Sequence, residues 1–240
     1  MSWTDLKSLE QMKKLRDRFN IKVFVETGTF RGNNAEAHAA NFETVITVES
    51  VEEYYWRAKN RLFPYTNVYK VFDDSPNFLR KFYFPLKNAG TIFFYLDAHF
   101  YDASLSPEDR WVVLKELKAL KGFGDCVIVI HDFKCNGLGH LTYDGQSLDF
   151  DLVKSDISKV NPNFHYYFNT QGGCEILTKE KLNNSCIPNL VLDEETADTM
   201  DFVWSNTETI HRAYRGLLYA TPEPLDLKQF ELVDFYELTT

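Results

Sequence analysis

Four side chains near the middle of the chain have the types and spacing needed for chemistry. Asp97 and His99 follow one apolar run, and His131 and Asp132 follow the next. Carboxylates and imidazoles bind divalent ions, and histidine is also the usual general base at neutral pH. One reading is therefore an Mg²⁺ or Mn²⁺ site at Asp97, His131 and Asp132, with His99 as the alternative nitrogen ligand. The other is proton removal by His99 or His131 without a metal. We favour the metal.

A second stretch, VFVETGTFRG, has the shape of a nucleotide-binding turn. A short β-branched run ends in Glu26, and Gly28 and Gly32 follow before a helical pattern. Glycines let the backbone approach a ligand, and the start of the next helix favours anionic groups. The spacing is G-x-x-x-G and not the G-x-G-x-x-G of dinucleotide sites. The turn alone is therefore weak evidence for a nucleotide-binding site, and the elements that follow it provide the support.

The elements that must position these residues alternate regularly along the chain. Helical periodicity marks residues 4–19, 33–41, 51–62, 75–82 and 107–120, and apolar strand-like runs occupy 22–26, 44–48, 68–72, 91–96 and 126–130. Strands that alternate with helices and are apolar on both faces are typical of a parallel sheet covered on both sides. We therefore expect an α/β, Rossmann-like sheet.

Each of the five runs ends in an acid or an acid–histidine pair: Glu26, Glu49, Asp74 before Ser75, Asp97 with His99, and His131 with Asp132. Ligands bind beyond the carboxyl ends of such strands, so we expect these groups to meet at one site. Glu49 follows the first glycine at about the distance at which a carboxylate accepts ribose hydroxyls. Asp74 and Ser75 are equally well interpreted as an adenine contact or as a helix cap.

The end of the chain is expected to close the sheet and then extend beyond it. A helix over 146–160 precedes two strands, about 163–169 and 173–178, which predict a terminal antiparallel hairpin and seven strands in all. We place a Rossmann-like domain at 1–181 and an extension packed on it at 182–240, with a helix or two in 196–218. The extension is interpreted as a lid, a homodimer contact or core cover.

The amino-acid composition limits the binding partners and the cellular location that we expect. The net charge of −9 disfavours a nucleic-acid surface, which needs a basic footprint. No apolar run reaches membrane-spanning length, and no signal-peptide pattern precedes the first helix. Four cysteines without C-x-x-C spacing favour reduced thiols, and so a cytoplasmic protein.

Together these motifs resemble the class I S-adenosylmethionine-dependent methyltransferases over about residues 22–179. The resemblance rests on VETGTFRG, TVES, DDS, LDAH and VIVIHDF. LDAHFY followed by VIVIHDF is most similar to the macrocin-type sugar O-methyltransferases, which hold a divalent cation. The chain departs from that pattern at His99 and His131, where Asp is usual, and in having fewer glycines in its first motif.

The resemblance implies a role for each motif. Glu26, Gly28, Thr29, Phe30 and Gly32 would form the methionine-binding turn. Glu49 and Ser50 would bind the ribose, Asp74 and Ser75 would lie on the adenine side, and Asp97 would contact the cofactor as well as the metal. The implied activity is O-methylation of a small hydroxylated acceptor, with a sugar as one candidate.

Two other functions remain open at this point. An NAD-dependent oxidoreductase would also use Glu49, although the glycine spacing and the final hairpin weigh against it. A non-catalytic methyltransferase-like binding protein would have no need of acids at every strand end.

Overall fold

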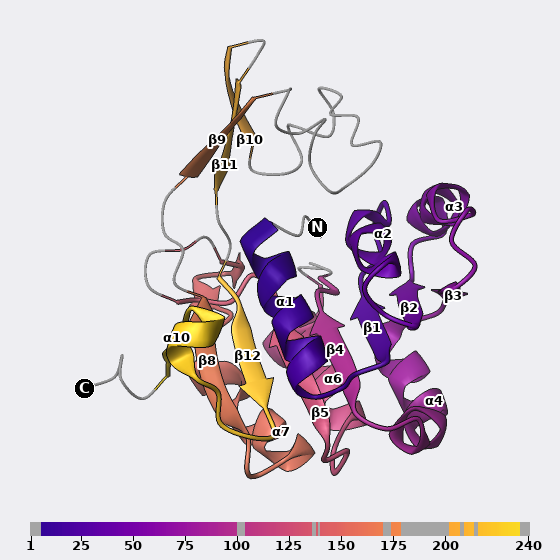
Figure 1. The fold of residues 1–240 in the computed structure, drawn as a ribbon, viewed down its shortest axis with the longest axis vertical. Helices are drawn as coiled ribbons and strands as arrows, with labels where there is room; N and C mark the ends of the chain where they lie inside the picture. The colour runs from indigo at the N-terminus through magenta and orange to yellow at the C-terminus, as the bar shows by residue number, and fades with distance from the viewer. Residues whose placement is uncertain are drawn as a thin grey trace.

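The computed structural model describes residues 6–99, 104–135, 138, 140–169, 174–178, 202–206, 209–213 and 216–235. Its centre is an eight-stranded sheet with the order β13-β8-β12-β5-β4-β1-β2-β3 (Figure 1). The five expected strands are all present and parallel: β1 (Val23–Thr27), β2 (Thr44–Glu49), β3 (Val68–Phe72), β4 (Ile92–Leu96) and β5 (Cys126–Ile130). The predicted α/β, mostly parallel fold is confirmed.

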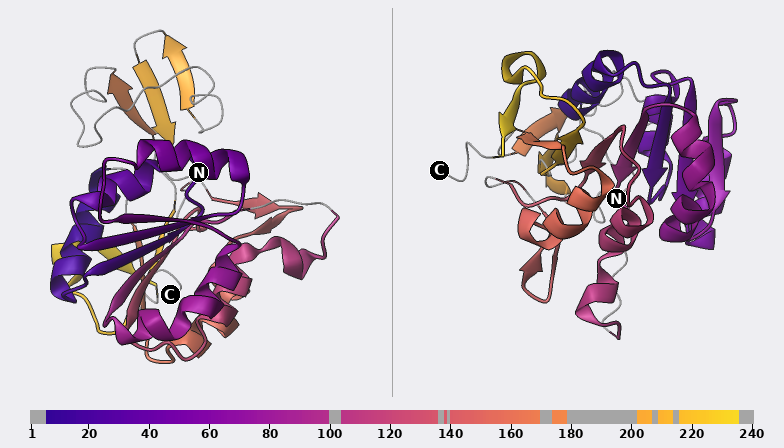
Figure 2. Two further views of the ribbon diagram at one scale, coloured as in Figure 1. Left: turned by 90° about the vertical axis from the view of Figure 1, so that its right-hand side faces the viewer. Right: turned by 90° about the horizontal axis from the view of Figure 1, so that it is seen from below.

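Helices cover both faces of this sheet, as Figure 2 shows from the side. One face carries α1 (Leu6–Arg18), α2 (Asn33–Ala39), α3 (Glu52–Arg61) and α10 (Leu227–Phe230); the other carries α4 (Ser75–Asn88), α6 (Val112–Ala119) and α7 (Phe150–Val160). Alternate strand residues feed the two cores: Phe24 packs with the first set and Val25 with the second. Both are fully buried, which explains the unbroken apolar runs.

The boundaries differ from the sequence expectation in two places. The helix expected over 107–120 is divided at Trp111 into α5 (Pro107–Arg110) and α6. The helix expected from residue 146 starts later, because β6 (Thr142–Tyr143) and β7 (Gln146–Ser147) form a small hairpin first. Helix α7 then begins after Asp149, whose carboxylate accepts a hydrogen bond from Leu152 N at 3.1 Å.

The predicted closing hairpin is wrong in its second strand. β8 (His165–Asn169) joins the main sheet, but β9 (Cys174–Thr178) pairs with β11 (Thr209–Ala213), which also pairs with β10 (Phe202–Asn206) in a separate three-stranded sheet. The place beside β8 is taken by β12 (Leu218–Thr221), which lies antiparallel between β5 and β8. A strand in that position is covered on both faces. Every residue of β12 is buried, whereas β9 would place Glu175 inside the sheet.

The part of the chain beyond residue 181 therefore completes the sheet. Besides β12 it supplies β13 (Leu232–Asp234), an edge strand antiparallel to β8, so the sheet has eight strands and not seven. The helices expected in 196–218 do not occur in its described residues, which form β10 and β11. The aromatic residues Tyr219 and Phe230 are buried in the core, as the aromatic content of this region predicts.

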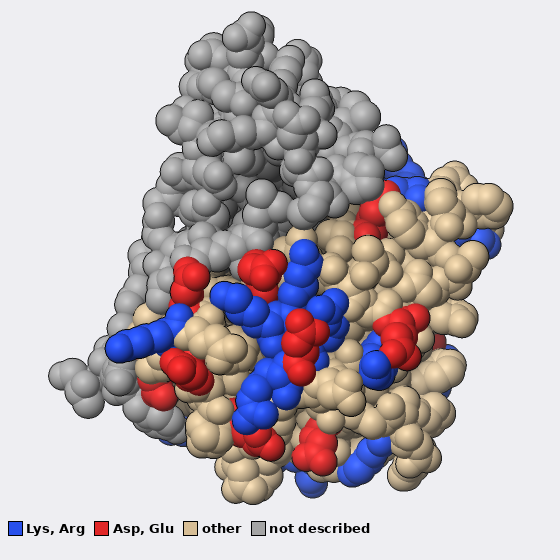
Figure 3. All heavy atoms as spheres, in the orientation of Figure 1, with Lys and Arg blue, Asp and Glu red and all other residues tan. Residues whose placement is uncertain are grey.

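Surface charge is mixed over α1. Lys13 pairs with Glu10 at 3.8 Å, and Arg18 pairs with Glu223 at 2.7 Å. Figure 3 shows basic and acidic side chains interspersed on this face. Among the helices of the described residues, none combines the length and apolar character that crossing a bilayer requires.

Candidate active site

The residues that follow the parallel strands lie in one row. Thr27 of β1 pairs with Val48 of β2 and with Leu96 of β4, and Leu96 pairs with Ile130 of β5. Glu49, Asp97 and His131 come directly after or at these paired positions, and Glu26 is one residue before, so all four lie at the same edge of the sheet. The expectation that the strand-end acids share one side of the molecule is confirmed for these residues.

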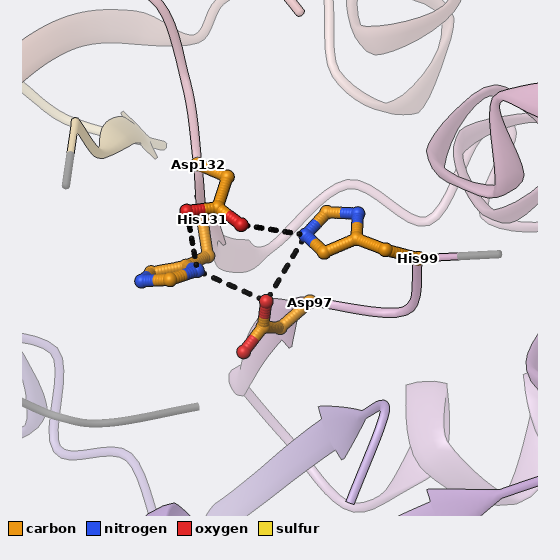
Figure 4. A group of neighbouring side chains, drawn as sticks. All are labelled: Asp97, His99, His131 and Asp132. Carbon is orange, nitrogen blue, oxygen red and sulfur yellow. Dashed lines mark hydrogen bonds and ion pairs between the residues drawn. The ribbon is translucent and has the colours of Figure 1, made fainter. Parts of the chain in front are cut away.

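Asp97, His99, His131 and Asp132 converge at this edge (Figure 4). His131 Nδ1 lies 3.0 Å from Asp97 Oδ1 and 3.3 Å from Asp132 Oδ1. His99 Nε2 lies 3.1 Å from the same Asp97 oxygen and 3.4 Å from Asp132 Oδ2. The four contacts close a ring in which carboxylates and imidazoles alternate.

The backbone holds this ring from several directions. Asp97 N donates to Thr27 Oγ1 at 3.2 Å, which ties the end of β4 to the end of β1. Asp132 has a left-handed backbone with a φ of 58°, a conformation that Asp and Asn adopt more readily than most residues. Its carbonyl accepts from Leu141 N at 2.8 Å, and the next residue, Phe133, donates its N–H to Gly216 O at 2.8 Å. The segment leading into β12 therefore supports the site directly.

Charge couples the four groups. Burial is the largest single influence on Asp97 and raises its pKa, but the charge of His131 and the hydrogen bonds from His131 and His99 together outweigh burial and hold that pKa below its usual range. Burial lowers the pKa of His131, and Asp132 and Asp97 outweigh it, raising the pKa of His131 to about 9. Burial also raises the pKa of Asp132, but the charges and hydrogen bonds of His131 and His99 together outweigh burial and hold this pKa well below its usual range. Each carboxylate is therefore ionised at neutral pH and available to a cation.

The donor set fits a divalent ion. The four residues each offer a ligand atom, and these atoms all lie within 4.8 Å of one another. Among the described residues, His99 Nε2 is a buried nitrogen without a hydrogen bond of good geometry, although two carboxylates lie beside it. A nitrogen in that position can bind a metal through its lone pair.

The glycine turn lies against the same cluster. Gly28 has a φ of 78°, and a Cβ at this position would lie 2.5 Å from the carbonyl oxygen of Asp97. Gly32 has a φ of 81° and precedes α2, while Phe30 between them has a φ of 49°. A bulky residue rarely adopts this conformation, so the surrounding contacts must hold it.

Glu49 supplies that hold. Its Oε2 accepts from Phe30 N at 2.7 Å and its Oε1 accepts from Val51 N at 2.9 Å. Each carboxylate oxygen has a second lone pair, so Glu49 retains capacity for ribose hydroxyls. Ser50, which follows Glu49, is exposed. Thr29 Oγ1 shares a 2.5 Å hydrogen bond with Thr47 Oγ1 beneath the turn.

Glu26 is buried below the turn. It accepts hydrogen bonds from Asn34 Nδ2 at 2.9 Å and Thr47 Oγ1 at 2.5 Å. Burial raises its pKa to about 8, because the hydrogen bonds compensate only part of the lost solvation. Glu26 therefore joins β1, β2 and α2 under the turn.

Asp74 and Ser75 both have structural partners. Asp74 caps α4 by accepting from Asn77 N at 3.1 Å. Ser75 Oγ donates to Glu116 Oε1 at 2.6 Å, and both residues are buried. The helix-cap interpretation of Asp74 is thus present in the structure, and the adenine role of both residues stays a prediction.

Sequence reasoning missed Glu116. It is fully buried on α6, and burial raises its pKa to about 7. Its spacing from Val113, Leu117 and Leu120 gave the one available signal, a glutamate inside an apolar helical stripe.

No protein-family model matches the sequence, and no curated protein matches it. Among solved structures, a precorrin 8W decarboxylase from Methanobacterium thermoautotrophicum aligns with a TM-score of 0.48 at 9% identity, covering 92% of this chain and 91% of its own. The O-methyltransferase TomG from Streptomyces achromogenes, solved in complex with SAM, aligns with a TM-score of 0.47 at 12% identity, covering 91% of this chain and 81% of its own.

A precorrin-6y C5,15-methyltransferase from Geobacter metallireducens aligns with a TM-score of 0.44 at 10% identity, covering 91% of this chain and 88% of its own. Scores below 0.5 at such identities are too low to assign a function. The function proposed below therefore depends on the site itself.

Proposed function

We propose that this protein is an S-adenosylmethionine-dependent O-methyltransferase that acts on a hydroxyl group of a small molecule, with a sugar as one candidate. The observation that carries the proposal is the contact between the glycine turn and the Asp97 segment. It puts a turn suited to a nucleotide-type cofactor directly beside four groups suited to activating a hydroxyl.

The binding residues for the cofactor are proposed from the strand ends. Gly28, Thr29, Phe30 and Gly32 would face the methionine part, and Glu26 would hold the turn from beneath through Asn34 and Thr47. Glu49 and Ser50 would face the ribose, and Asp74 and Ser75 the adenine. The cofactor, when bound, supplies a methyl group on a positively charged sulfur, and the nearby carboxylates Glu49 and Asp97 favour that charge.

The remaining task of the protein is to orient an acceptor hydroxyl and take its proton. Asp97, His131 and Asp132, with a divalent ion such as Mg²⁺, would lower the pKa of the hydroxyl. Without an ion, His99 or His131 would accept the proton and be held in place by Asp97 and Asp132. Both routes use the same four side chains.

The proposed setting follows from composition and burial. The net charge of −9 supports a small-molecule acceptor over nucleic acid, and a homodimer contact remains a proposal for part of 182–240. Cys126 and Cys135 are buried free thiols, which supports a reducing, cytoplasmic location.

Calorimetric titration with S-adenosylmethionine, S-adenosylhomocysteine and NAD tests the proposal directly. We expect both adenosyl compounds to bind and NAD not to bind. NAD binding without S-adenosylmethionine binding would favour an oxidoreductase instead.

Catalysis is tested with Asp97→Asn in an assay of S-adenosylhomocysteine release with a panel of hydroxylated acceptors. We expect turnover to fall by about 10² to 10⁴-fold, because a neutral amide binds a cation more weakly than a carboxylate does and does not stabilise a charged imidazole. Asp17→Asn, an exposed aspartate on α1, is the matched control and should leave turnover unchanged. Equal activity of wild type and Asp97→Asn would remove Asp97 from the mechanism.

A further inference from the structure

The ring formed by Asp97, His99, His131 and Asp132 has the dimensions of a metal coordination sphere. Its four contacts measure 3.0, 3.1, 3.3 and 3.4 Å. Ligand atoms about 2.0 to 2.2 Å from one ion lie roughly 3.0 to 3.5 Å apart when they occupy neighbouring positions. Every side of the ring falls in this range. Neighbouring members of the ring therefore have the spacing of ligands, and both histidines take part, whereas the sequence offered them as alternatives.

Hydrogen bonding alone does not account for the ring. The Nδ1 atom of His131 and the Nε2 atom of His99 each face two carboxylate oxygens. One imidazole N–H donates well to only one acceptor, so each nitrogen has more oxygens around it than it can serve. Among the described residues, Nε2 of His99 makes no hydrogen bond of good geometry. A cation between the four groups would satisfy all of them at once.

Charge leads to the same inference. Asp97 and Asp132 are 2% and 5% exposed, and two buried carboxylates side by side need compensating positive charge, which a divalent ion supplies more fully than one protonated imidazole. One divalent ion with two carboxylates and two neutral imidazoles forms a neutral set.

We propose that Asp97, His99, His131 and Asp132 together bind one first-row transition-metal ion, such as Mn²⁺, Fe²⁺, Co²⁺ or Zn²⁺, in preference to Mg²⁺. Imidazole nitrogen suits these ions, whereas Mg²⁺ prefers oxygen ligands and keeps several waters. Two nitrogen donors out of four therefore select against Mg²⁺. The inference deepens the proposed function, because the ion would lie where the acceptor hydroxyl is activated, and it changes the expected metal.

Metal binding is measured on the full chain, independently of turnover. The protein is freed of metal with a chelator and titrated with Co²⁺, whose visible absorption reports nitrogen ligands and coordination number. We expect one Co²⁺ per chain, displaced by Zn²⁺ and not by a large excess of Mg²⁺. Displacement of Co²⁺ by Mg²⁺ at comparable concentration, or absence of stoichiometric Co²⁺ binding, would overturn the inference.

Two variants test His99. We expect His99→Ala to weaken Co²⁺ binding by at least about 100-fold, beyond the loss typical of an outer-shell partner, and to change the absorption spectrum. His99→Asp keeps a ligand but replaces nitrogen by oxygen, so its preference should move toward Mg²⁺ and Mn²⁺. His165→Ala, an exposed histidine on β8, is the control and should bind Co²⁺ as the wild type does. Wild-type Co²⁺ affinity in His99→Ala would exclude His99 as a ligand.

The outcome is separable from that of the proposed function. Binding of S-adenosylmethionine by the metal-free protein, measured by calorimetry, tests the cofactor without the ion. Cofactor binding without metal binding would contradict the metal inference and leave the methyltransferase proposal intact. Metal binding without cofactor binding would contradict the methyltransferase proposal and leave the metal inference intact.

Discussion

Three buried carboxylates near the sheet edge are stabilised in different ways. Asp97 lies beside two histidines and keeps its charge. Glu26 and Glu116 receive hydrogen bonds from neutral donors only, and burial raises their pKa values to about 8 and about 7. Charge at this edge is thus concentrated on the Asp97 cluster, and the two glutamates serve as neutral structural groups over part of the pH range.

Glu116 should make stability fall as the pH rises. Its pKa is about 7 in the folded protein and 4.5 ordinarily, so the folded state binds more protons between these values. The free energy of unfolding should drop across this window by up to about 3 kcal/mol. Glu116→Gln should show a smaller drop than the wild type when urea unfolding is measured at pH 4.5 and pH 8, and the part that remains comes from Glu26. Glu53→Gln, at an exposed glutamate, is the control; a pH dependence in Glu116→Gln equal to that of the wild type would contradict the assignment.

His38 should make stability fall as the pH decreases. It is fully buried and stacked on Phe24 at 4.2 Å, and among the described residues neither ring nitrogen has a hydrogen-bond partner. Burial lowers its pKa from 6.5 to about 3, so the unfolded chain binds the proton more tightly in this range. The contribution is complete above pH 6.5 and is lost by about 1.4 kcal/mol per pH unit below it.

The variant His38→Leu should flatten the acid side of the stability curve, which thermal unfolding between pH 4 and pH 7 would measure. His165→Gln, at an exposed histidine, serves as the control. A curve for His38→Leu as steep as that of the wild type would assign the acid sensitivity to other groups.

The four proposed site residues were predictable from the sequence because they lie at or just beyond the ends of two strands. Asp97 and His131 needed only the positions of two apolar runs and the rule that parallel strands end at one edge. The burial of Glu116 and its hydrogen bond with Ser75 result from the packing of α6 against α4. The sequence pattern of one helix contains little information about such packing. Local motifs therefore gave the ring, and long-range packing decided what surrounds it.

At the scale of elements, the turn between β1 and α2 is the part under most constraint. It contains three residues with positive φ, Gly28, Phe30 and Gly32, and it is held by Glu49 from the end of β2. These contacts fix the conformation of the turn, and a pre-organised turn lowers the cost of binding the proposed cofactor.

Gly28 is constrained both by its left-handed backbone and by the close approach of the Asp97 carbonyl, and a second glycine allows the two effects to be measured separately. Gly145 has a φ of 82° with open space around it, whereas a Cβ on Gly28 would meet the Asp97 carbonyl. Gly28→Ala and Gly145→Ala should each lose about 1 kcal/mol of stability through the left-handed backbone. Only Gly28→Ala should also lose turnover, by about 10²-fold, because it displaces Asp97. Similar turnover in the two variants would show that the contact with Asp97 has no catalytic importance.

At the scale of the whole molecule, β12 makes the main sheet continuous, because it connects β5 with β8. It pairs with β5 on one side and β8 on the other, although β8 precedes it by an insertion that contains a separate sheet. Sequence patterns could not locate it, because β9 and β12 are equally strand-like locally. The two strands differ in charge: β9 contains Glu175, whereas β12 has no charged residue. This difference matters only in the buried position between β5 and β8, which a local sequence pattern does not reveal.

A chain ending at residue 181, the boundary that the sequence suggested, should therefore fail to fold cooperatively. It would lack β12 and leave apolar edges on β5 and β8. The matched control replaces residues 170–215 by a short hairpin turn and keeps β12, since Leu218 already pairs with Phe168. We expect a sharp thermal transition in the control and none in the truncated chain. Cooperative unfolding of the truncated chain would show that β12 is dispensable.

The order of synthesis differs from the order in the sheet. A ribosome releases β5 and β8 well before β12, because residues 170–217 come between them. During synthesis, β5 and β8 therefore have unpaired edges until β12 is made and inserts between them. In that interval other nascent chains can pair with these edges. Substitutions that delay the docking of β12 should therefore reduce the yield of soluble protein during translation even when the finished molecule is as stable as before.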